Sequence, residues 1–302
     1  MRLLLLFFFC FSSFSRADVQ QTDHLPRPWN DKQSLFDKLD PKLIALGEKL
    51  FFDPGLSRNR KVSCATCHQP AFSYSNGEER ARGWRGENTD YNVPVLFNRI
   101  ESTLQFWDGR AATLHEQIFQ PILNIKEMGM DEKTLLERLN VDQSYHALVS
   151  QKFTRELIET ALETFVKSLV SGDSRYDRYV AGNATALSAE EVEGKNLFFE
   201  KYKCSRCHSG ANFTNDALSV RCGSTSNRYS VKYKVPTLRN LSSSKPYFHN
   251  GRLEKLEDVL QFYDQPNNEH GFLVSLADQE KLILFLSTLN APVLSYRKSG
   301  KK

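Results

Sequence analysis

A five-residue unit, C-x-x-C-H, occurs twice in this chain and limits what it can fold into. The first copy is Cys64-Ala65-Thr66-Cys67-His68 and the second is Cys204-Ser205-Arg206-Cys207-His208. This spacing allows both thiols to bond to the vinyl groups of one haem while the adjacent imidazole binds the iron. Each unit is therefore expected to attach one haem c group covalently through its two cysteines and to bind the iron through its histidine.

Two other uses of cysteine pairs fit less well. Zinc sites often contain C-x-x-C pairs, but here 136 residues lie between Cys67 and Cys204, and a histidine follows each pair directly. A thioredoxin-like redox pair would be accompanied by a βαβ pattern, which the sequence does not show around either unit. Cys222 lies outside both units, as a free thiol or a crosslinker.

Residues 1–17 have the pattern of a secretory signal peptide. Arg2 precedes an apolar run from Leu3 to Phe11, and small residues before Asp18 offer a cleavage site. The run is too short to span a bilayer, so we expect export to the periplasm without a stable membrane anchor. Without this segment the net charge of +4 falls to about +2, which does not indicate a nucleic-acid partner.

A second repeat precedes the two haem units. Gly47-Glu48-Lys49-Leu50-Phe51-Phe52-Asp53 lies before the first unit, and Gly194-Lys195-Asn196-Leu197-Phe198-Phe199-Glu200 lies before the second. An internal repeat of this kind predicts two similar haem domains. The expected boundaries are 18–39 for an N-terminal lead, 40–172 for the first domain and 184–295 for the second, with Gly172 to Asn183 as the linker.

The rest of the pattern is mostly helical, with long loops and no β-rich alternation. Capping residues and helical spacing of apolar residues predict helices that begin at Asp40-Pro41, Asp131, Thr154 and Ser188, together with helices near 111–120, 256–263 and 276–289. Residues 69–98 are rich in Gly, Arg and Asn, and we expect a loop that covers a cofactor there. The predicted fold class is mostly α.

The axial ligands of the two irons differ in how far the sequence determines them. After the first unit no histidine follows until His115, so that iron has one evident ligand and an open side. No methionine follows Met130, so the candidates for the second iron are His249, His270 and tyrosines such as Tyr263. From its spacing alone, Tyr263 is more simply interpreted as a core tyrosine with a bonded hydroxyl.

Three side chains after the first unit could serve an iron that binds a small molecule. They are Trp107, Gln117 and Glu127. A carboxylate can move a proton between the two oxygens of a peroxide, and an amide can stabilise the charge that develops. Without further information, each also has a simpler interpretation, as a core tryptophan, a helix-face amide and a surface acid.

Taken together, these motifs resemble the bacterial di-haem cytochrome c peroxidase and MauG family, over residues 40 to about 290. Besides the two haem units, the resemblance rests on five segments: Leu50-Phe51-Phe52-Asp53-Pro54, Phe106-Trp107-Asp108-Gly109-Arg110-Ala111, Glu127-Met128, Pro236-Thr237-Leu238-Arg239-Asn240 and Pro246-Tyr247-Phe248-His249-Asn250-Gly251. It implies two cytochrome c-like haem domains, with the haems near the domain interface.

The resemblance also implies roles for individual residues. Trp107 corresponds to an electron bridge between the haems, and Gln117 and Glu127 correspond to the distal pair over the peroxide-binding haem. The family's calcium ion between the haems would be bound by Asn92 and by the backbone carbonyls of Ser244 and Pro246.

Two departures from the cytochrome c peroxidases resemble MauG-like members. The Arg82-Gly83-Trp84 stretch has no histidine to ligate the first haem, so that haem is expected to be open without prior reduction. Tyr263 lies seventeen residues after Pro246, where the peroxidases use a methionine, so the resemblance favours Tyr263 as ligand of the second haem. Tyr202 takes the place of a surface tryptophan that relays electrons in MauG.

The implied activity is that of an exported H2O2-dependent oxidoreductase. Peroxide would form high-valent haem, and electrons would then come from a periplasmic protein, with a Trp or Tyr side chain of a partner protein as the MauG-like substrate. One alternative is a cytochrome c peroxidase that reduces H2O2 to water with electrons from a small cytochrome or copper protein. Another is a non-catalytic di-haem electron carrier.

Overall fold

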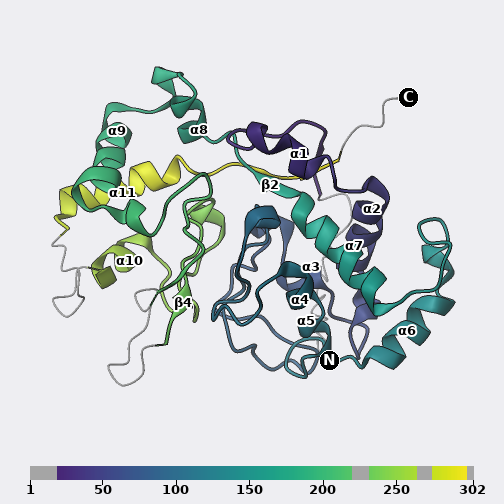
Figure 1. The fold of residues 1–302 in the computed structure, drawn as a ribbon. Coiled ribbons are helices and arrows are strands. Elements are labelled where there is room, and N and C mark those ends of the chain that lie inside the picture. Colours follow the sequence, from purple (N-terminus) through teal and green to yellow (C-terminus); the bar gives the residue numbers. More distant parts are fainter. Residues whose placement is uncertain (1–18, 220–230, 264–273, 298–302) are drawn as a thin grey trace, which may run out of the picture.

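The computed structural model describes residues 19–219, 231–263 and 274–297 of the 302-residue chain, and it is mostly helical, as predicted (Figure 1). The predicted signal peptide, Cys222 and His270 lie outside the described residues. Among the described residues, no helix is both long enough and apolar enough to span a bilayer.

The elements have the following bounds. The α-helices are α1 (Gln33–Phe36), α2 (Pro41–Phe52), α3 (Cys64–Cys67), α4 (Leu114–Ile118), α5 (Gln120–Leu123), α6 (Glu132–Val141), α7 (Arg155–Ser168), α8 (Arg175–Val180), α9 (Ala189–Asn196), α10 (Leu256–Tyr263) and α11 (Leu276–Ser287). Short 3-10 turns are η2 (Asn30–Lys32), η3 (Pro54–Leu56), η4 (Pro70–Phe72), η5 (Arg99–Glu101), η6 (Gln143–Tyr145), η7 (Ala184–Ala186), η9 (Cys204–Arg206) and η10 (Leu241–Ser243), and η8 (Leu197–Lys201) is a π-helical turn. The strands are β1 (Gln21–Thr22), β2 (Leu169–Ser171), β3 (Leu218–Ser219), β4 (Tyr233–Lys234) and β5 (Val293–Tyr296).

The predicted helix starts are confirmed by their caps. Asp40 accepts a hydrogen bond from the Lys42 amide at 2.8 Å, with Pro41 as the first residue of α2. Asp131 and Thr154 cap α6 and α7 through their side chains. A capping box of the kind expected for α9 is also present. Each cap satisfies amide groups that the first helical turn leaves without a partner.

The internal repeat corresponds to two helix crossings of the same design. A Cβ atom at Gly47 of α2 would lie 1.9 Å from the carbonyl oxygen of Ala161 in α7, and one at Gly194 of α9 would lie 1.9 Å from that of Lys281 in α11. Only glycine allows the paired backbones to approach so closely. The repeated glycine therefore marks the crossing point in both halves.

A phenylalanine pair follows each crossing. The rings of Phe51 and Phe165 lie 5.1 Å apart at 57°, and those of Phe198 and Phe285 lie 5.3 Å apart at 54°. The first pair belongs to a hydrophobic cluster built around α2 and α7, and the second pair to a separate cluster built around α9 and α11. The two halves of the chain thus have similar but distinct cores.

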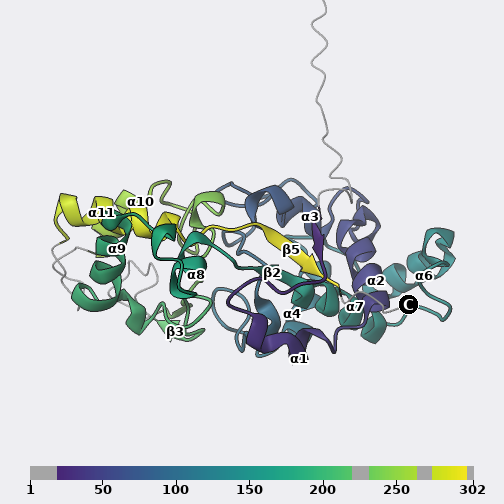
Figure 2. The ribbon, with the colours of Figure 1, turned by 90° about the horizontal axis from the view of Figure 1, so that it is seen from above.

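A strand that the sequence did not predict connects the two halves. β5 follows α11 and returns to the first half, where it pairs antiparallel with β2 and parallel with β1 (Figures 1 and 2). Buried residues of the N-terminal lead pack on this sheet, including Trp29, whose indole nitrogen donates to the Ser171 carbonyl at 2.8 Å. β5 thereby ties the second half of the chain to the first half.

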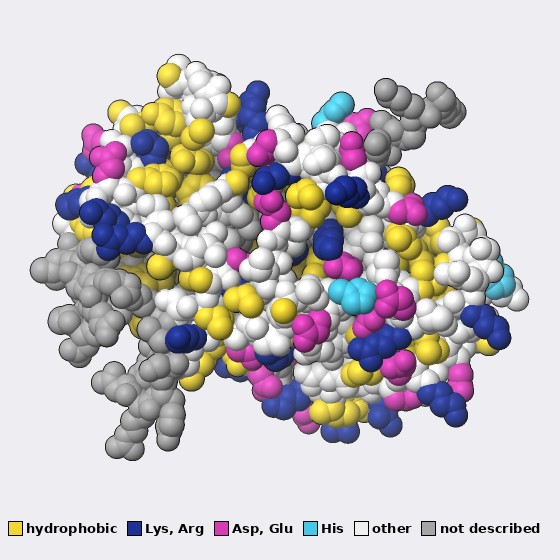
Figure 3. Space-filling view, in the orientation of Figure 1, with side chains coloured by type: hydrophobic (Ala, Val, Ile, Leu, Met, Phe, Trp, Pro, Cys, Tyr) yellow, Lys and Arg dark blue, Asp and Glu magenta, His cyan; other side chains and the backbone are white. Residues whose placement is uncertain are grey.

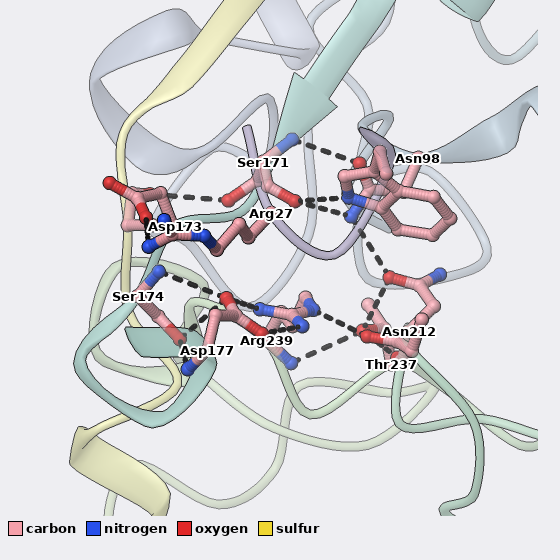
Figure 4. Close-up of polar contacts among 12 residues, drawn as sticks. Arg27, Asn98, Ser171, Asp173, Ser174, Asp177, Asn212, Thr237 and Arg239 are labelled. Atoms are coloured by element: carbon pink, nitrogen blue, oxygen red, sulfur yellow. Dashed lines mark hydrogen bonds and ion pairs between the residues drawn. The ribbon is translucent and has the colours of Figure 1, made fainter. Parts of the chain in front are cut away.

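A buried ion pair strengthens the same junction (Figure 4). Arg239 donates to both carboxylate oxygens of Asp177 at 2.9 and 2.7 Å, and their side chains are 1% and 3% exposed. Asp177 lies in α8, within the expected linker. Nearby, the Asn98 amide donates to Asn212 at 3.1 Å and so joins the two halves directly.

Candidate functional site

One continuous cavity of about 700 Å³ lies between the halves, and both C-x-x-C-H units line it. Most other lining residues are apolar side chains from both cores, including Phe51, Leu162, Phe198 and Leu282. The two units therefore face a common apolar interior from opposite halves of the chain.

His68 is held as a neutral imidazole at the wall of the cavity. It follows the single turn α3 (Cys64–Cys67), and its Nδ1 lies 2.9 Å from the Tyr74 carbonyl oxygen. Burial lowers the pKa of His68 to about 4. Because the carbonyl can only accept, Nδ1 carries the proton, and the lone pair on Nε2 is available to a metal ion.

His208 repeats this arrangement in the second half. Its Nδ1 lies 3.3 Å from the Phe213 carbonyl oxygen and 3.2 Å from that of Pro236, and burial lowers its pKa to about 4. The four cysteines of the two units form no disulfide. Two free thiols and one oriented neutral imidazole on each side of an apolar cavity are a donor set that fits two haem c groups.

Glu127 and Gln117 reach the same cavity from the first half. Gln117 lies in α4 and Glu127 in the turn after α5, and both line the cavity with His68. The Asn124 amide donates to Glu127 Oε1 at 2.6 Å. Burial raises the pKa of Glu127 and the bond from Asn124 opposes that rise. A half-buried carboxylate with a raised pKa, held by one donor, is suited to accept and return a proton.

The histidine-free loop at Arg82-Gly83-Trp84 packs on the turn that carries Glu127. The Trp84 amide donates to the Glu127 carbonyl at 2.7 Å, and a Cβ at Gly83 would lie 1.9 Å from the Lys126 carbonyl oxygen. Among the described residues that line the cavity, the only histidines are the two of the C-x-x-C-H units. This part of the chain therefore offers no second imidazole to the first unit.

Trp107 lies at the cavity wall where the halves meet. Its Nε1 donates to the Asn92 carbonyl at 2.8 Å, and it packs against the small cluster of Tyr233 and Val235, against which Cys207 of the second unit also packs. Trp107 thus shares a hydrophobic cluster with the second unit and lines the cavity that both units share.

The three expected calcium ligands, Asn92, Ser244 and Pro246, all line the cavity, and the Asn92 backbone amide donates to the His249 carbonyl at 2.8 Å. The Asn92 amide nitrogen donates to the carbonyls of Glu78 at 3.0 Å and Glu79 at 3.3 Å. The Asn92 amide oxygen, which is the kind of ligand that Ca²⁺ prefers, therefore points away from these carbonyls.

Tyr263 and His249, two candidate ligands for the second unit, differ in their position. Tyr263 is the last residue of α10 and lines the cavity, as do Leu256, Val259 and Leu260 of the same helix. His249 is stacked on Tyr233 with the ring centres 3.7 Å apart and is not among the lining residues.

Tyr202 lies at the cavity but not at the surface. Its side chain is 5% exposed, and it lines the cavity. Its hydroxyl donates to Asp278 Oδ2 at 2.7 Å, and Lys201 contacts the same oxygen at 2.6 Å. Burial, together with the bond to Asp278, raises the pKa of Tyr202.

Two features of the site were missed from the sequence. Asn124, which orients Glu127, lies three residues before it in a turn. Asp278, which holds the Tyr202 hydroxyl, lies 76 residues from it. The first could have been suspected from the short spacing, whereas no local signal joins the second to its partner.

Comparison with known proteins identifies the family of the chain. The family model described as di-haem cytochrome c peroxidase matches residues 41–185. The chain is 34% identical to the methylamine utilization protein MauG of Methylorubrum extorquens, over 91% of this chain and 87% of that protein. It is 31% identical to the cytochrome c551 peroxidase of Nitrosomonas europaea, over 82% and 79%. Its fold is similar to that of a MauG-like protein associated with microbial copper homeostasis, with a TM-score of 0.76 and 22% identity, covering 89% of this chain and 93% of that one.

Proposed function

The chain belongs to the di-haem cytochrome c peroxidase and MauG family and is a haem peroxidase-type oxidoreductase, and from this premise we propose that it uses H2O2 to oxidise a Trp or Tyr side chain of a partner protein. The observation that carries the proposal is one cavity that holds both C-x-x-C-H units, Glu127 and Gln117, with no further histidine among its described lining residues.

The family is a di-haem family, and the two units provide for covalent attachment of both haems. His68 and His208 would bind the irons through Nε2, since Nδ1 of each faces backbone carbonyls. When bound, the haems supply an iron that reacts with peroxide and a second centre that shares the oxidising equivalents. Every other step depends on side chains of the chain itself.

Glu127 moves the proton that cleavage of the peroxide bond requires. As a carboxylate it accepts the proton from the oxygen nearer to the first unit, and as an acid it returns that proton to the departing oxygen, which leaves as water. The Asn124 donor keeps the carboxylate in one orientation. The Gln117 amide, on the same cavity wall, binds the departing oxygen and stabilises its charge.

Tyr263 would provide an oxygen ligand to the haem iron of the second unit. An anionic oxygen stabilises ferric iron over ferrous iron, so this centre is suited to hold oxidising equivalents rather than to deliver electrons. Its position on the face of α10 that lines the cavity supports the assignment. Trp107, which packs with Cys207 on the cluster of Tyr233 and Val235, is the side chain that would connect the two centres electronically.

Tyr202 and Asp278 would connect the second centre with the partner protein, with Tyr202 transferring the electron and Asp278 accepting the proton. If Tyr202 gave one electron to the second centre, its phenolic proton would move along the 2.7 Å hydrogen bond to Asp278. The partner side chain would then supply one electron to Tyr202, and Asp278 would return the proton. Leu276 and Leu284 of the same helix α11 are 74% and 40% exposed. Figure 3 shows hydrophobic side chains gathered over this half of the molecule, which suits a protein partner.

A second candidate function is reduction of H2O2 to water with electrons from a small cytochrome or copper protein. The 31% identity to a cytochrome c551 peroxidase favours it. In both cases we propose a periplasmic location, one calcium ion bound by Asn92, Ser244 and Pro246, and the same peroxide step.

Peroxide titration of the resting diferric holoprotein separates these functions. The protein-oxidising function predicts a two-electron-oxidised state that forms directly and persists without a donor. If the reaction with peroxide required prior reduction and a cytochrome donor, the protein would be a cytochrome c peroxidase instead. If it did not react with peroxide at all, it would be a non-catalytic electron carrier. Glu127→Gln should slow the peroxide step by about 10²–10⁴-fold, whereas Glu137→Gln, at an exposed site in α6, should not.

A further inference from the structure

His115 lies on α4 opposite three glutamates of α7, away from the haem cavity. Glu156, Glu159 and Glu163 are spaced at i, i+3 and i+7, so their side chains share one face of α7. His115 Nδ1 lies 3.1 Å from Glu163 Oε2, and its Nε2 lies 3.5 Å from both Glu156 Oε2 and Glu159 Oε2. None of these four residues lines the cavity between the haem units.

The contact with Glu163 decides which ring nitrogen is free to bind a metal ion. A carboxylate only accepts, so Nδ1 donates its proton to Glu163 and the Nε2 lone pair faces the other two carboxylates. An imidazole whose Nδ1–H is held by a carboxylate is the usual arrangement of a metal-ligating histidine. Nε2 and the two carboxylate oxygens that lie 3.5 Å from it are then three candidate ligand atoms for one metal ion.

The distances suit a small divalent ion. Zinc bonds to imidazole nitrogen and carboxylate oxygen of about 2.0–2.1 Å with tetrahedral angles place two ligand atoms about 3.4 Å apart, close to the 3.5 Å found for Nε2 and each oxygen. The ligand atoms of His115, Glu156 and Glu159 all lie within 4.8 Å of one another. Small side-chain adjustments would therefore complete the site.

The neighbouring cations leave these oxygens available. Arg155 binds Glu159 through Oε1 at 2.8 Å, and Lys167 binds Glu163 through Oε1 at 2.7 Å. Glu159 and Glu163 thus each bind a cation with one carboxylate oxygen and turn the other oxygen toward His115. Three carboxylates against two basic side chains leave a net negative charge around Nε2, which favours a cation.

We propose that His115, Glu156 and Glu159 bind a divalent transition-metal ion of the Zn²⁺ type, with Glu163 orienting the imidazole. The nitrogen and oxygen ligand set fits Zn²⁺ better than Ca²⁺, which prefers oxygen ligands alone. Glu159 is buried and Glu156 is 75% exposed, so the ion is reached from solvent and water completes its coordination. The ion would tie α4, which carries Gln117, to α7.

Calorimetric titration of the chelator-treated holoprotein with Zn²⁺ tests the site. We expect one Zn²⁺ that His115→Gln weakens at least 10-fold and that Glu163→Gln weakens about 10–100-fold, as loss of an orienting partner does. His146→Gln, at an exposed histidine outside the cluster, is the matched control and should bind as the natural protein does. Saturating Zn²⁺ should also raise the melting temperature of the natural protein.

Two results would overturn the proposal. Either the His115→Gln protein binds Zn²⁺ as tightly as the natural protein, or the natural protein binds none at this stoichiometry while its circular dichroism is normal. In both cases the cluster would be a surface ion-pair network of a protonated His115. Because binding is read by heat and by melting, the outcome does not depend on the proposed peroxide chemistry.

Discussion

Replacing Asn124 by aspartate tests the proton-transfer role of Glu127 without removing Glu127 itself. The Asn124 amide nitrogen donates to Glu127 Oε1 at 2.6 Å, and its amide oxygen accepts from the Lys126 amide at 3.0 Å. Asn124→Asp keeps the acceptor for Lys126, and with it the turn, but replaces the donor to Glu127 with a second carboxylate. The change therefore acts mainly on the charge state of Glu127.

The size of the effect follows from that one hydrogen bond. A hydrogen bond to a charged group is worth about 1.5–3 kcal/mol, and about 1.4 kcal/mol corresponds to one pKa unit. Burial already raises the pKa of Glu127, and the bond from Asn124 lowers it. Loss of the bond should therefore raise the pKa of Glu127 further, and repulsion from the new carboxylate adds to the rise.

The rate of the peroxide step should depend on pH through the ionisation of Glu127. Glu127 must be ionised to accept the proton from peroxide, so the rate rises with pH through the pKa of Glu127. In Asn124→Asp this rise in rate should move to higher pH, and well above it the rate should approach that of the natural protein.

Stopped-flow measurement of the peroxide reaction across pH gives this profile. Asn183→Asp is the matched control, because Asn183 also accepts a turn hydrogen bond, from the Thr185 amide at 3.2 Å, and lies at the surface. If Asn124→Asp changed the rate equally at all pH values, its effect would be structural, and Glu127 would not be the base. An unchanged profile would lead to the same conclusion.

Three further substitutions test other parts of the account. Tyr263→Phe should change the absorption spectrum of the second haem, because it removes the proposed oxygen ligand, and an identical spectrum would refute that assignment. Gly194→Ala would place a Cβ 1.9 Å from the Lys281 carbonyl oxygen and should lower the free energy of unfolding in urea by at least about 1–3 kcal/mol; no loss would mean that the helix crossing tolerates a side chain. Asp177→Asn leaves Arg239 buried without its counter-charge and should cost about 3–5 kcal/mol in the same assay, whereas a cost near zero would show that the pair is not needed at the junction.

Sequence reasoning was most successful where the signal is local. Asp40-Pro41 and the Ser188 capping box predicted the starts of α2 and α9, because capping involves residues only two or three positions apart. The repeated glycine predicted two similar halves, and the structure adds the physical reason: the close approach of α2 to α7 and of α9 to α11 at Gly47 and Gly194.

Non-local pairings were not predictable in this way. β5 has four residues, and it becomes a strand because β1 and β2, more than a hundred residues earlier, provide its partners. The ring of Tyr202 packs in the core around α11, and its hydroxyl is held by Asp278, 76 residues later. Such features depend on contacts between distant segments of the chain, which one stretch of sequence does not encode.

Electron paramagnetic resonance of the resting diferric protein tests the central claim most directly. The account predicts two different irons: a high-spin centre at His68, open toward Glu127, and a second centre with nitrogen and oxygen axial ligands from His208 and Tyr263. Two low-spin signals, both typical of nitrogen or sulfur axial ligands alone, would contradict it.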